Sequence, residues 1–374
     1  MTEELEIFRD AVRKFFEREF LPHQERWSKQ GYIDREAWLK AGEMGLLCAS
    51  IPEQYGGGGG NFAHEAVINM EMTRVQANFG VGVHSGIVAH YILAYGSEEQ
   101  KQHWLPRMAT GEMVAAIAMS EPGVGSDLKN VKTRAVREGD HYVINGSKTF
   151  ITNGYHANLI CVVTKTNPEL GAKGISLIMV ETEGQEGFRR GRLLEKIGLK
   201  AQDTVELFFD NVRAPCSNLL GDQEGVGFVQ LMQQLPQERM IIAVNAVSSM
   251  HRAVELTAEY VRQREVFGQH LSELQNTRFK LAECQTIATV ATTFVDQCVM
   301  RLLEGSLDTT TAAMAKWWTS QQNCDVIDEC LQLHGGYGYI LEYPIAKMYA
   351  NARVSKIYGG SNEIMKELIA RKTV

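Results

Sequence analysis

The order in which helical and strand-like periodicities follow one another constrains this chain more than any other feature. Residues 1 to about 115 place apolar side chains at three- and four-residue spacing, as in LEIFRDAVRKFFEREFLPH, which predicts helices. From about 113 to 221, short β-rich runs such as NLICVVTKT and GISLIMVET follow one another, with EGD and NG as hairpin signals. Helical patterns return at about 224–264, 271–304 and 307–334, and Ser361 can cap a last helix.

Helices, then strands, then helices again indicate segregated domains rather than alternating βαβ units. We therefore expect an α+β chain, mainly α, with three domains. These are an N-terminal helical domain (1–112), a middle β-barrel or β-sandwich domain (113–221) and a C-terminal helical bundle (222–374). A length of 374 residues suits two or three domains with a large core.

Charge and composition argue against several classes of protein. A net charge of −7 argues against a nucleic-acid binder, because such proteins neutralise phosphates with basic side chains. The longest apolar runs are too short to span a bilayer, so we expect no transmembrane segment. Seven scattered cysteines, an odd number without a CxxC, predict reduced thiols and a cytoplasmic location. The ten histidines show no HxxxH pairing with carboxylates, so we expect no metal site.

Two short motifs in the middle region suit a flat, phosphate-bearing cofactor. MSEPGVGSD (119–127) combines glycines with a proline, and such a rigid loop can offer free N–H groups to a pyrophosphate or a flavin edge. An ordinary connection fits that motif about equally well. TFITNG (149–154) sets an aromatic beside a threonine, although Phe150 taken alone would be a core residue. A Rossmann dinucleotide site is not expected, because no GxGxxG occurs.

One carboxylate lies on an apolar helix face. In QLPQERMIIA (234–243), Leu235, Glu238 and Ile242 share a face, and a carboxylate there is costly unless it is paired or used. Spacing alone leaves both interpretations open: a structural glutamate paired with arginines of a neighbouring region, or a functional acid. Pro236 is expected to disturb the helix just before Glu238. His334, in QLHGGYGY, is expected to be a satisfied core histidine rather than a catalyst.

Taken together and in this order, several stretches over essentially the whole chain resemble the acyl-CoA dehydrogenase family. They are AMSEPGVGSD, TFITNG, KIGLKAQDTVELFFDNV, RQREVFG, LQLHGGYGYILEYPIAK and IYGGSNEIMKELIAR. The resemblance implies a helical domain, a β-domain and a C-terminal four-helix bundle, with FAD bound between them. It also implies a homotetramer, a dimer of dimers. Val124 and Asn130 depart from the small residues usual in the first stretch.

The resemblance also implies roles for individual residues. Those that would line the flavin and the path of the thioester are Met119, Ser120, Ser126, Phe150 and Thr152, with Thr152 near the hydride-accepting N5. Those that a neighbouring subunit would bring to the adenine and pyrophosphate are Arg264, Phe267, Gln275, Gln332, Gly335 and Gly336. The last loop would add Ser361 and Glu363 to the cofactor site. The substrate would meet Ser126, Arg239 and Gly360.

The catalytic base is assigned by resemblance to a subgroup. Many members carry a glutamate directly after the tyrosine of IYGGSNE, where this chain has Gly359. Long-chain and isovaleryl-type members instead place the carboxylate on the long bundle helix just before an arginine, as in Glu238–Arg239. The resemblance thus implies that Glu238 removes the α-proton and that the N–H of Gly359 binds the developing oxyanion. An apolar surrounding would raise the pKa of Glu238 toward neutrality.

The implied reaction is the FAD-dependent dehydrogenation of a saturated acyl-CoA, of medium to long chain, to trans-2-enoyl-CoA in fatty acid β-oxidation. The implied electron acceptor is an electron-transfer flavoprotein. Three alternatives stay open: a branched short-chain, isovaleryl-type dehydrogenase; an acyl-CoA oxidase or flavin monooxygenase; and a CoA-binding scaffold without catalysis. Side chains in GIVAHYILAYG (86–96) are expected to set the pocket depth.

Overall fold

The structure is a computed structural model that describes residues 2–374, and its first part is helical. The N-terminal helices are α1 (Glu3–Glu19), α2 (Gln24–Gln30), α3 (Arg35–Glu43), α4 (Phe62–Arg74), α5 (Val81–Val83), α6 (Ala89–Tyr95) and α7 (Glu98–Ala109). A π-helical turn, His84–Val88, leads from α5 into α6. Aromatic side chains, among them Phe16, Phe20 and Trp38, fill the core between these helices. The predicted N-terminal helical region is confirmed.

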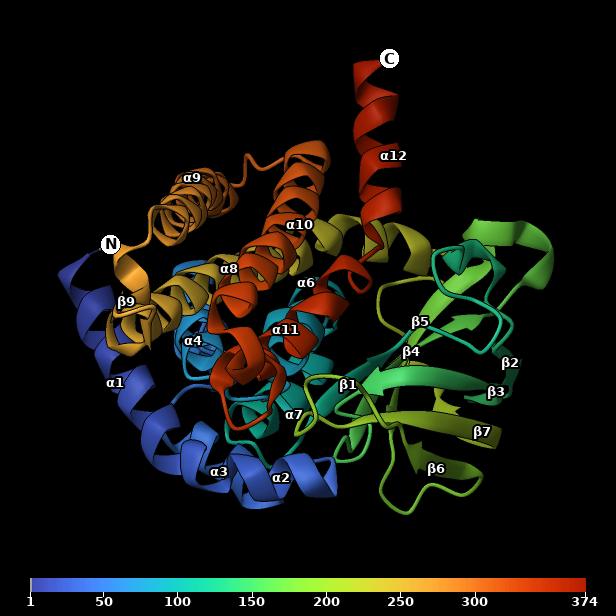
Figure 1. Ribbon diagram of the computed structural model, residues 1–374. Coiled ribbons are helices and arrows are strands. Elements are labelled where there is room, and N and C mark those ends of the chain that lie inside the picture. Colours follow the sequence, from blue (N-terminus) through green and yellow to red (C-terminus); the bar gives the residue numbers. More distant parts are fainter. Residues whose placement is uncertain (1) are drawn as a thin grey trace.

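The middle region forms a single seven-stranded sheet that lies beside the helices (Figure 1). Its strands are β1 (Ala115–Ala118), β2 (Arg134–Glu138), β3 (His141–Thr152), β4 (Leu159–Lys165), β5 (Ile175–Glu181), β6 (Phe188–Leu193) and β7 (Thr204–Pro215). The order is β1-β4-β2-β3-β7-β6, with β5 paired to β4. Only the pairings of β4 with β1 and β2 are parallel. The strands predicted from the β-rich runs are confirmed.

The two hairpin signals have different outcomes. EGD makes the turn of the β2–β3 hairpin, in which Glu138 pairs with His141, as predicted. The turn predicted from NG at 145–146 is wrong, because this dipeptide lies inside β3 at a register shift against β7. Gly146 is required there by close packing: a Cβ would come within 2.4 Å of Thr133 Oγ1. The dipeptide thus marks a β-bulge rather than a chain reversal.

The C-terminal region is a bundle built on three long helices. Its elements are α8 (Gly227–Gln263), the strands β8 (Glu265–Val266) and β9 (Gln269–His270), α9 (Gln275–Leu303), α10 (Thr309–His334), α11 (Pro344–Ala352) and α12 (Asn362–Thr373). The three long helices confirm the predicted periodic segments. Ser361 caps α12 by accepting a hydrogen bond from the N–H of Ile364, as predicted. α8 continues through Pro236, so the expected disturbance is absent, because packing along a 37-residue helix outweighs one missing hydrogen bond.

Close packing joins the three regions where the π-helical turn meets α8. A Cβ at Gly86 would lie 2.5 Å from Cδ1 of Ile241, so this glycine lets the two backbones approach. The fully buried His84 accepts a hydrogen bond from the N–H of Ala115 at Nδ1 and donates from Nε2 to the carbonyl of Met108. Within residues 2–374, no helix combines the length and the apolar character needed to cross a bilayer.

Candidate active site

Glu238 is buried where α8 faces α6. Its side chain is 5% exposed, and Oε1 accepts a 2.8 Å hydrogen bond from the hydroxyl of Tyr91, which is itself fully buried. The bond connects residues 147 positions apart and joins the N-terminal helices to the bundle. The hydrogen-bond partner of Glu238 is thus a tyrosine. The interpretation of Glu238 as a structural glutamate required arginines of a neighbouring region as partners.

The surroundings of Glu238 make it a weaker acid than an ordinary glutamate. Burial raises its pKa from 4.5 to about 7, while the hydrogen bond from Tyr91 and the charge of Arg239 act in the opposite direction. Burial disfavours the charged form, whereas a hydrogen bond to the carboxylate favours it. A carboxylate with such a pKa is ionised in part near neutrality and can therefore exchange a proton there.

The loop before α12 reaches the same face of α8. Gly359 and Gly360 both have a positive φ, +64° and +86°, and Gly359 packs against Ile242, one turn along α8 from Glu238. Across residues 2–374, the N–H of Gly359 donates no hydrogen bond to another protein atom. A free backbone N–H on the helix face that carries a buried carboxylate fits the expectation for an oxyanion donor.

Two buried cations lie near each other in this region, and one of them contacts the loop. Lys316 on α10 is fully buried and donates to the carbonyl of Gly360 at 2.7 Å and to Oδ1 of Asn362 at 3.0 Å. The pKa of Lys316 is lowered to about 8, mainly by burial and to a smaller extent by the charge of Arg239. Arg239 is 2% exposed, and no group of the described chain accepts a hydrogen bond from its Nε or Nη1. Since an unpartnered buried guanidinium is costly, Arg239 is suited to a bound polar group.

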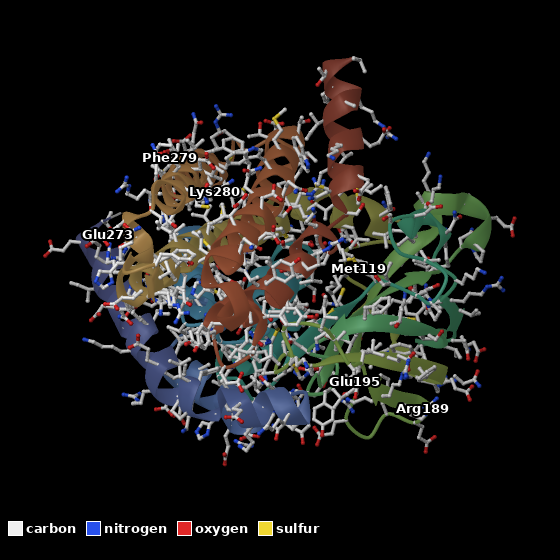
Figure 2. The ribbon with its side chains drawn as sticks, in the orientation of Figure 1. Met119, Arg189, Glu195, Glu273, Phe279 and Lys280 are labelled. Carbon is white, nitrogen blue, oxygen red and sulfur yellow. The ribbon has the colours of Figure 1, made fainter. Side chains whose placement is uncertain are left out.

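The two predicted flavin motifs meet at the edge of the sheet that faces the helices. The N–H of Thr149 donates to the carbonyl of Ser120 at 2.9 Å, and Figure 2 labels Met119 where sheet and helices adjoin. Phe150 is 69% exposed with a φ of +60°, so the core interpretation is wrong. A register shift between Lys148 and Ile151 turns its ring away from the sheet's interior. Ser126 is exposed and Thr152 half-buried.

A buried ion pair holds this loop in place. Nζ of Lys148 contacts Oε1 of Glu121 at 2.9 Å and donates to the carbonyls of Met119 and Val163. Both charged side chains are almost completely enclosed, at 0% and 5% exposure. Glu121 also accepts hydrogen bonds from the backbone N–H groups of Lys132 and Thr133. The pair therefore ties the loop after β1 to β3.

A second group of predicted residues lines a hollow of about 800 Å³ near the far end of α8. The predicted residues that line it are Arg264, Gln332, Gly335 and Gly336. Phe267, at the tip of the β8–β9 hairpin, is 95% exposed, and Gln275 is exposed at the start of α9. His334 is buried, contacts the Cys330 carbonyl through Nδ1 and stacks on Tyr260, as expected for a satisfied core histidine.

The hollow and Glu238 do not form one site within a single chain. Arg264 follows Glu238 by 26 residues, which in an α-helix corresponds to about 39 Å. Ser361 and Glu363 instead lie at the start of α12, beside the glycine loop. The predicted residues thus fall into a group around Glu238, a group around Thr152 and a group around the hollow.

The groups around Thr152 and around the hollow fit the parts of FAD. A Cβ at Gly335, Gly336, Gly123 or Gly125 would meet nothing within 4 Å, so these backbones leave room for a ligand. The guanidinium of Arg264 lies over the ring of Tyr337 and forms no ion pair with any residue of the described chain, so it is suited to phosphate. The exposed ring of Phe150 offers an apolar face.

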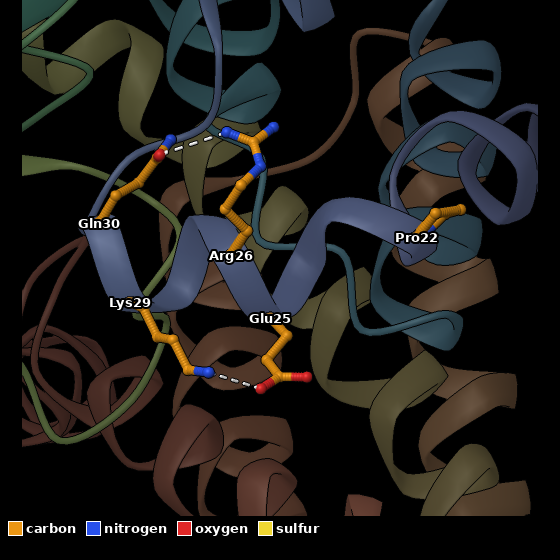
Figure 3. A pocket seen from close by; sticks show the side chains of 5 residues that line it. All are labelled: Pro22, Glu25, Arg26, Lys29 and Gln30. Carbon is orange, nitrogen blue, oxygen red and sulfur yellow. Dashed lines mark hydrogen bonds and ion pairs between the residues drawn. The ribbon is translucent and has the colours of Figure 1, made fainter.

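Another hollow, of about 630 Å³, contains none of the predicted residues. It lies along α2 and is lined by Pro22, Glu25, Arg26, Lys29 and Gln30 (Figure 3). Lys29 pairs with Glu25 and Arg26 donates to Gln30, both one turn apart. These are the ordinary contacts of a charged, solvated helix face.

Three residues that shape the site were not predicted from the sequence. Tyr91 lies in the stretch that was expected only to set pocket depth, and no role was predicted for Lys316 or Lys148. For Tyr91 and Lys316 the available signal was a polar side chain within a mostly apolar segment, whereas the neighbours of Lys148 in INGSKTF are themselves polar and gave no such signal. Their partners are 15 to 147 residues away along the chain, so spacing could not identify them.

Comparisons with known proteins cover the whole chain. Three family models match: "Acyl-CoA dehydrogenase, N-terminal domain" over residues 2–112, "middle domain" over 116–212 and "C-terminal domain" over 225–374. A long-chain specific mitochondrial acyl-CoA dehydrogenase of Sus scrofa is 50% identical over the full chain and 87% of its own length.

Solved structures agree. A crystal structure of an acyl-CoA dehydrogenase from Geobacillus kaustophilus has 49% identity and a TM-score of 0.97, covering 100% of this chain and 98% of that one. A glutaryl-CoA dehydrogenase from Mycobacterium smegmatis, solved in complex with FADH2, has 28% identity and a TM-score of 0.93. It covers 100% of this chain and 95% of its own.

Proposed function

Because the chain belongs to the acyl-CoA dehydrogenase family of FAD-dependent oxidoreductases, we propose that it dehydrogenates saturated acyl-CoA thioesters with Glu238 as the base. Two observations together carry this proposal: a carboxylate is buried on α8, and residue 359 is a glycine without a side chain. No side chain at 359 can act as the base, whereas Glu238 has a pKa of about 7 and an apolar surrounding. A base with that pKa is well matched to neutral pH.

The residues of the chain divide the work as follows. Glu238 accepts the α-proton, and the electron pair of the broken C–H bond moves toward the thioester carbonyl. The N–H of Gly359, which donates no hydrogen bond within residues 2–374, would stabilise the oxygen on which that charge develops. FAD, when bound, accepts the β-hydrogen together with its electron pair.

Other residues hold the two ligands. Met119, Ser120, Ser126, Phe150 and Thr152 would border the flavin. Arg264, Gln332, Gly335 and Gly336 would hold its pyrophosphate and adenine, with Phe267 and Gln275, from a neighbouring subunit of a homotetramer. Arg239 and Gly360, with Ser126, would face the substrate, and Ser361 and Glu363 would meet the cofactor.

The chain length of the substrate is proposed to be medium to long, as the name of the 50% identical relative suggests. Isovaleryl-type substrates are the competing class, because the base position alone does not separate them. Anaerobic flavin reduction with a panel from isovaleryl-CoA to hexadecanoyl-CoA separates the two. A role in fatty acid β-oxidation, an electron-transfer flavoprotein as acceptor and a cytoplasmic location stay predictions.

The test of the base uses Glu238→Gln. We expect this variant to bind FAD normally and to show no bleaching of the flavin by dodecanoyl-CoA under anaerobic conditions. Glu65→Gln is the matched control, because Glu65 is likewise fully buried, with a pKa raised to about 7 by burial, but bonds to Ser50 instead. If dodecanoyl-CoA bleached the flavin of Glu238→Gln as fast as that of the unmodified protein, Glu238 would not be the base.

Two further assays separate the reaction types. Peroxide release measured against dye reduction distinguishes an oxidase or monooxygenase from a dehydrogenase. A protein that purifies without yellow colour and takes up no FAD on reconstitution would instead favour the non-catalytic scaffold.

A further inference from the structure

The hydroxyl of Tyr91 occupies one oxygen of Glu238 and leaves the other free. Oε1 accepts the 2.8 Å hydrogen bond from Tyr91. For Oε2, residues 2–374 supply no donor, and this oxygen is not among the enclosed unpartnered atoms, so it retains accessible surface. The two carboxylate oxygens are therefore inequivalent before any ligand is present.

We propose that Tyr91 is a positioning residue that fixes Oε1 of Glu238 and thereby makes Oε2 the oxygen that receives the α-proton. This inference rests on the proposed function. In the step it describes, the Cα–H bond of the acyl-CoA breaks, an O–H bond forms at Oε2, and the electron pair stays with the substrate as its enolate. Tyr91 keeps its own proton throughout.

The geometry around the hydroxyl supports a dedicated contact rather than an incidental one. Tyr91 is 0% exposed and Glu238 5%, so water does not compete for the bond. Tyr91 follows the π-helical turn His84–Val88, and such turns often mark functional positions in helices. The side-chain amide of Gln237, adjacent to Glu238, donates to the carbonyl of Gly86 in that turn, so α8 is bonded both to α6 and to the turn that precedes it.

Few other groups can influence the titration of Glu238. The titratable and charged groups that face it are Tyr91 and Tyr95 from α6, Cys161 from β4 and Arg239 from α8 itself. Burial raises the pKa of Tyr95 above 10 and that of Cys161 to about 12, so both stay neutral around pH 7. Arg239 stays charged. Glu238 is therefore the group of this set that titrates near neutrality.

Removing the hydroxyl has a defined consequence. A hydrogen bond to a carboxylate favours its charged form, so its loss raises the pKa of the base. We expect the rate of anaerobic flavin reduction by dodecanoyl-CoA to rise with pH in both the unmodified protein and Tyr91→Phe. In Tyr91→Phe this rise should occur at a pH higher by about one unit or more. We expect the plateau rate to fall about tenfold, since positioning is lost, while the concentration of dodecanoyl-CoA at half-saturation stays the same.

The control is Tyr95→Phe, one turn along the same helix. The hydroxyl of Tyr95 bonds to the carbonyl of Gln230 and to Oε1 of Gln233, not to Glu238. This variant loses a tyrosine hydroxyl from the same interface, yet we expect its pH limb to stay in place. An equal shift in both variants would show a general loosening of α6 against α8 and would overturn the proposal.

A second readout does not depend on turnover. The infrared band of the protonated Glu238 carboxyl, assigned by its absence in Glu238→Gln holoenzyme, should disappear at a higher pH in Tyr91→Phe. Placing 3-fluorotyrosine at position 91 keeps the shape and strengthens the donor, so the band should disappear at a lower pH. This second variant decides the matter if Tyr91→Phe does not fold, and an unmoved midpoint in either would refute the positioning role.

The outcomes separate the two claims. If dodecanoyl-CoA still bleaches the flavin of Glu238→Gln, the assignment of Glu238 as the base is wrong. If Glu238→Gln is inactive and the midpoint is the same with and without the Tyr91 hydroxyl, only the role of Tyr91 is wrong.

Discussion

A Cβ on Gly359 would lie 2.3 Å from Cδ1 of Ile242, so the α8 side chain fills the space that any side chain at 359 would need. The positive φ of +64° at Gly359 adds a backbone conformation that side-chain-bearing residues rarely adopt. Ile242 lies on the face of α8 that carries Glu238, one turn away. The residue that blocks a base in the last loop and the residue proposed to supply it thus share one helix face.

The first prediction concerns the stability of this contact. Gly359→Ala should lower the free energy of unfolding by about 1–3 kcal/mol, from the clash and the strained φ together. Ile242→Val removes Cδ1, and the next atom, Cγ1, is 3.8 Å away, so Gly359→Ala should cost less in the Ile242→Val background. Denaturant unfolding of the two single variants and the double variant measures the coupling.

Gly360→Ala is the matched control for that cycle. Its φ is +86°, and its Cβ would meet Cε of Met365 at 2.7 Å rather than Ile242. Ile242→Val should therefore leave the cost of Gly360→Ala unchanged. Additive costs for Gly359→Ala and Ile242→Val would contradict the proposed contact.

The second prediction concerns pH and stability. The pKa of Glu238 is about 7 in the folded state, against 4.5 for an ordinary glutamate, so the folded state holds more protons between these values. Stability from this group is then complete below pH 4.5 and is lost as the pH rises through about 7. A difference of one pH unit between the folded and unfolded pKa values corresponds to about 1.4 kcal/mol.

Replacement of the carboxyl by an amide removes this dependence. Glu238→Gln should therefore gain stability relative to the unmodified protein as the pH rises across this window. Unfolding titrations of both proteins at several pH values measure the difference. If the difference in unfolding free energy between the two proteins were the same at about pH 5, inside the window, and at about pH 8, above it, Glu238 would not be titrating as proposed.

Local features of the fold were predictable from sequence, because their physical causes are local. The periodicity of apolar residues located α8, α9 and α10 to within a few residues, and the hydroxyl of Ser361 marked the start of α12. Leu235 and Ile242 on either side of Glu238 indicated that this carboxylate is buried. The EGD turn followed from the preference of Gly139 for a positive φ, here +63°.

Features that depend on distant partners were not predictable in the same way. The order of the sheet places β4 beside β1, β2 and β5, which no spacing along the chain encodes. The NG of β3 satisfies a local turn rule, yet the ladder with β7 and the contact with Thr133 override it. Tyr91 and Lys148 find their partners only after folding has brought three segments together.

The third prediction tests the buried ion pair of Lys148 and Glu121. Lys148→Met leaves Glu121 enclosed without its cation, and breaking such a pair typically costs about 3–5 kcal/mol. Lys148 also holds the carbonyl of Met119, so we expect weaker FAD binding, seen as higher flavin release on dilution. In Lys148→Met/Glu121→Gln the uncompensated charge is gone, and the double variant should unfold at higher denaturant than Lys148→Met. If the double variant were the less stable one, the pairing would not be the source of the cost.

The fourth prediction concerns Phe267, which the β8–β9 hairpin presents almost completely to solvent at its tip. Gly268 follows it with a φ of +78°, so a two-residue turn with two positive φ values holds the ring outward. A large aromatic exposed by 95% is expected to bury its surface against another molecule. If that molecule is a second copy of this chain, Phe267→Ser should lower both the assembled mass in light scattering and the flavin content. Leu170→Ser, on the short 3-10 segment Pro168–Gly174 of the β-domain with 55% exposure, is the control that should change neither. A Phe267→Ser protein of full mass and full flavin content would remove this hairpin from the proposed subunit contact.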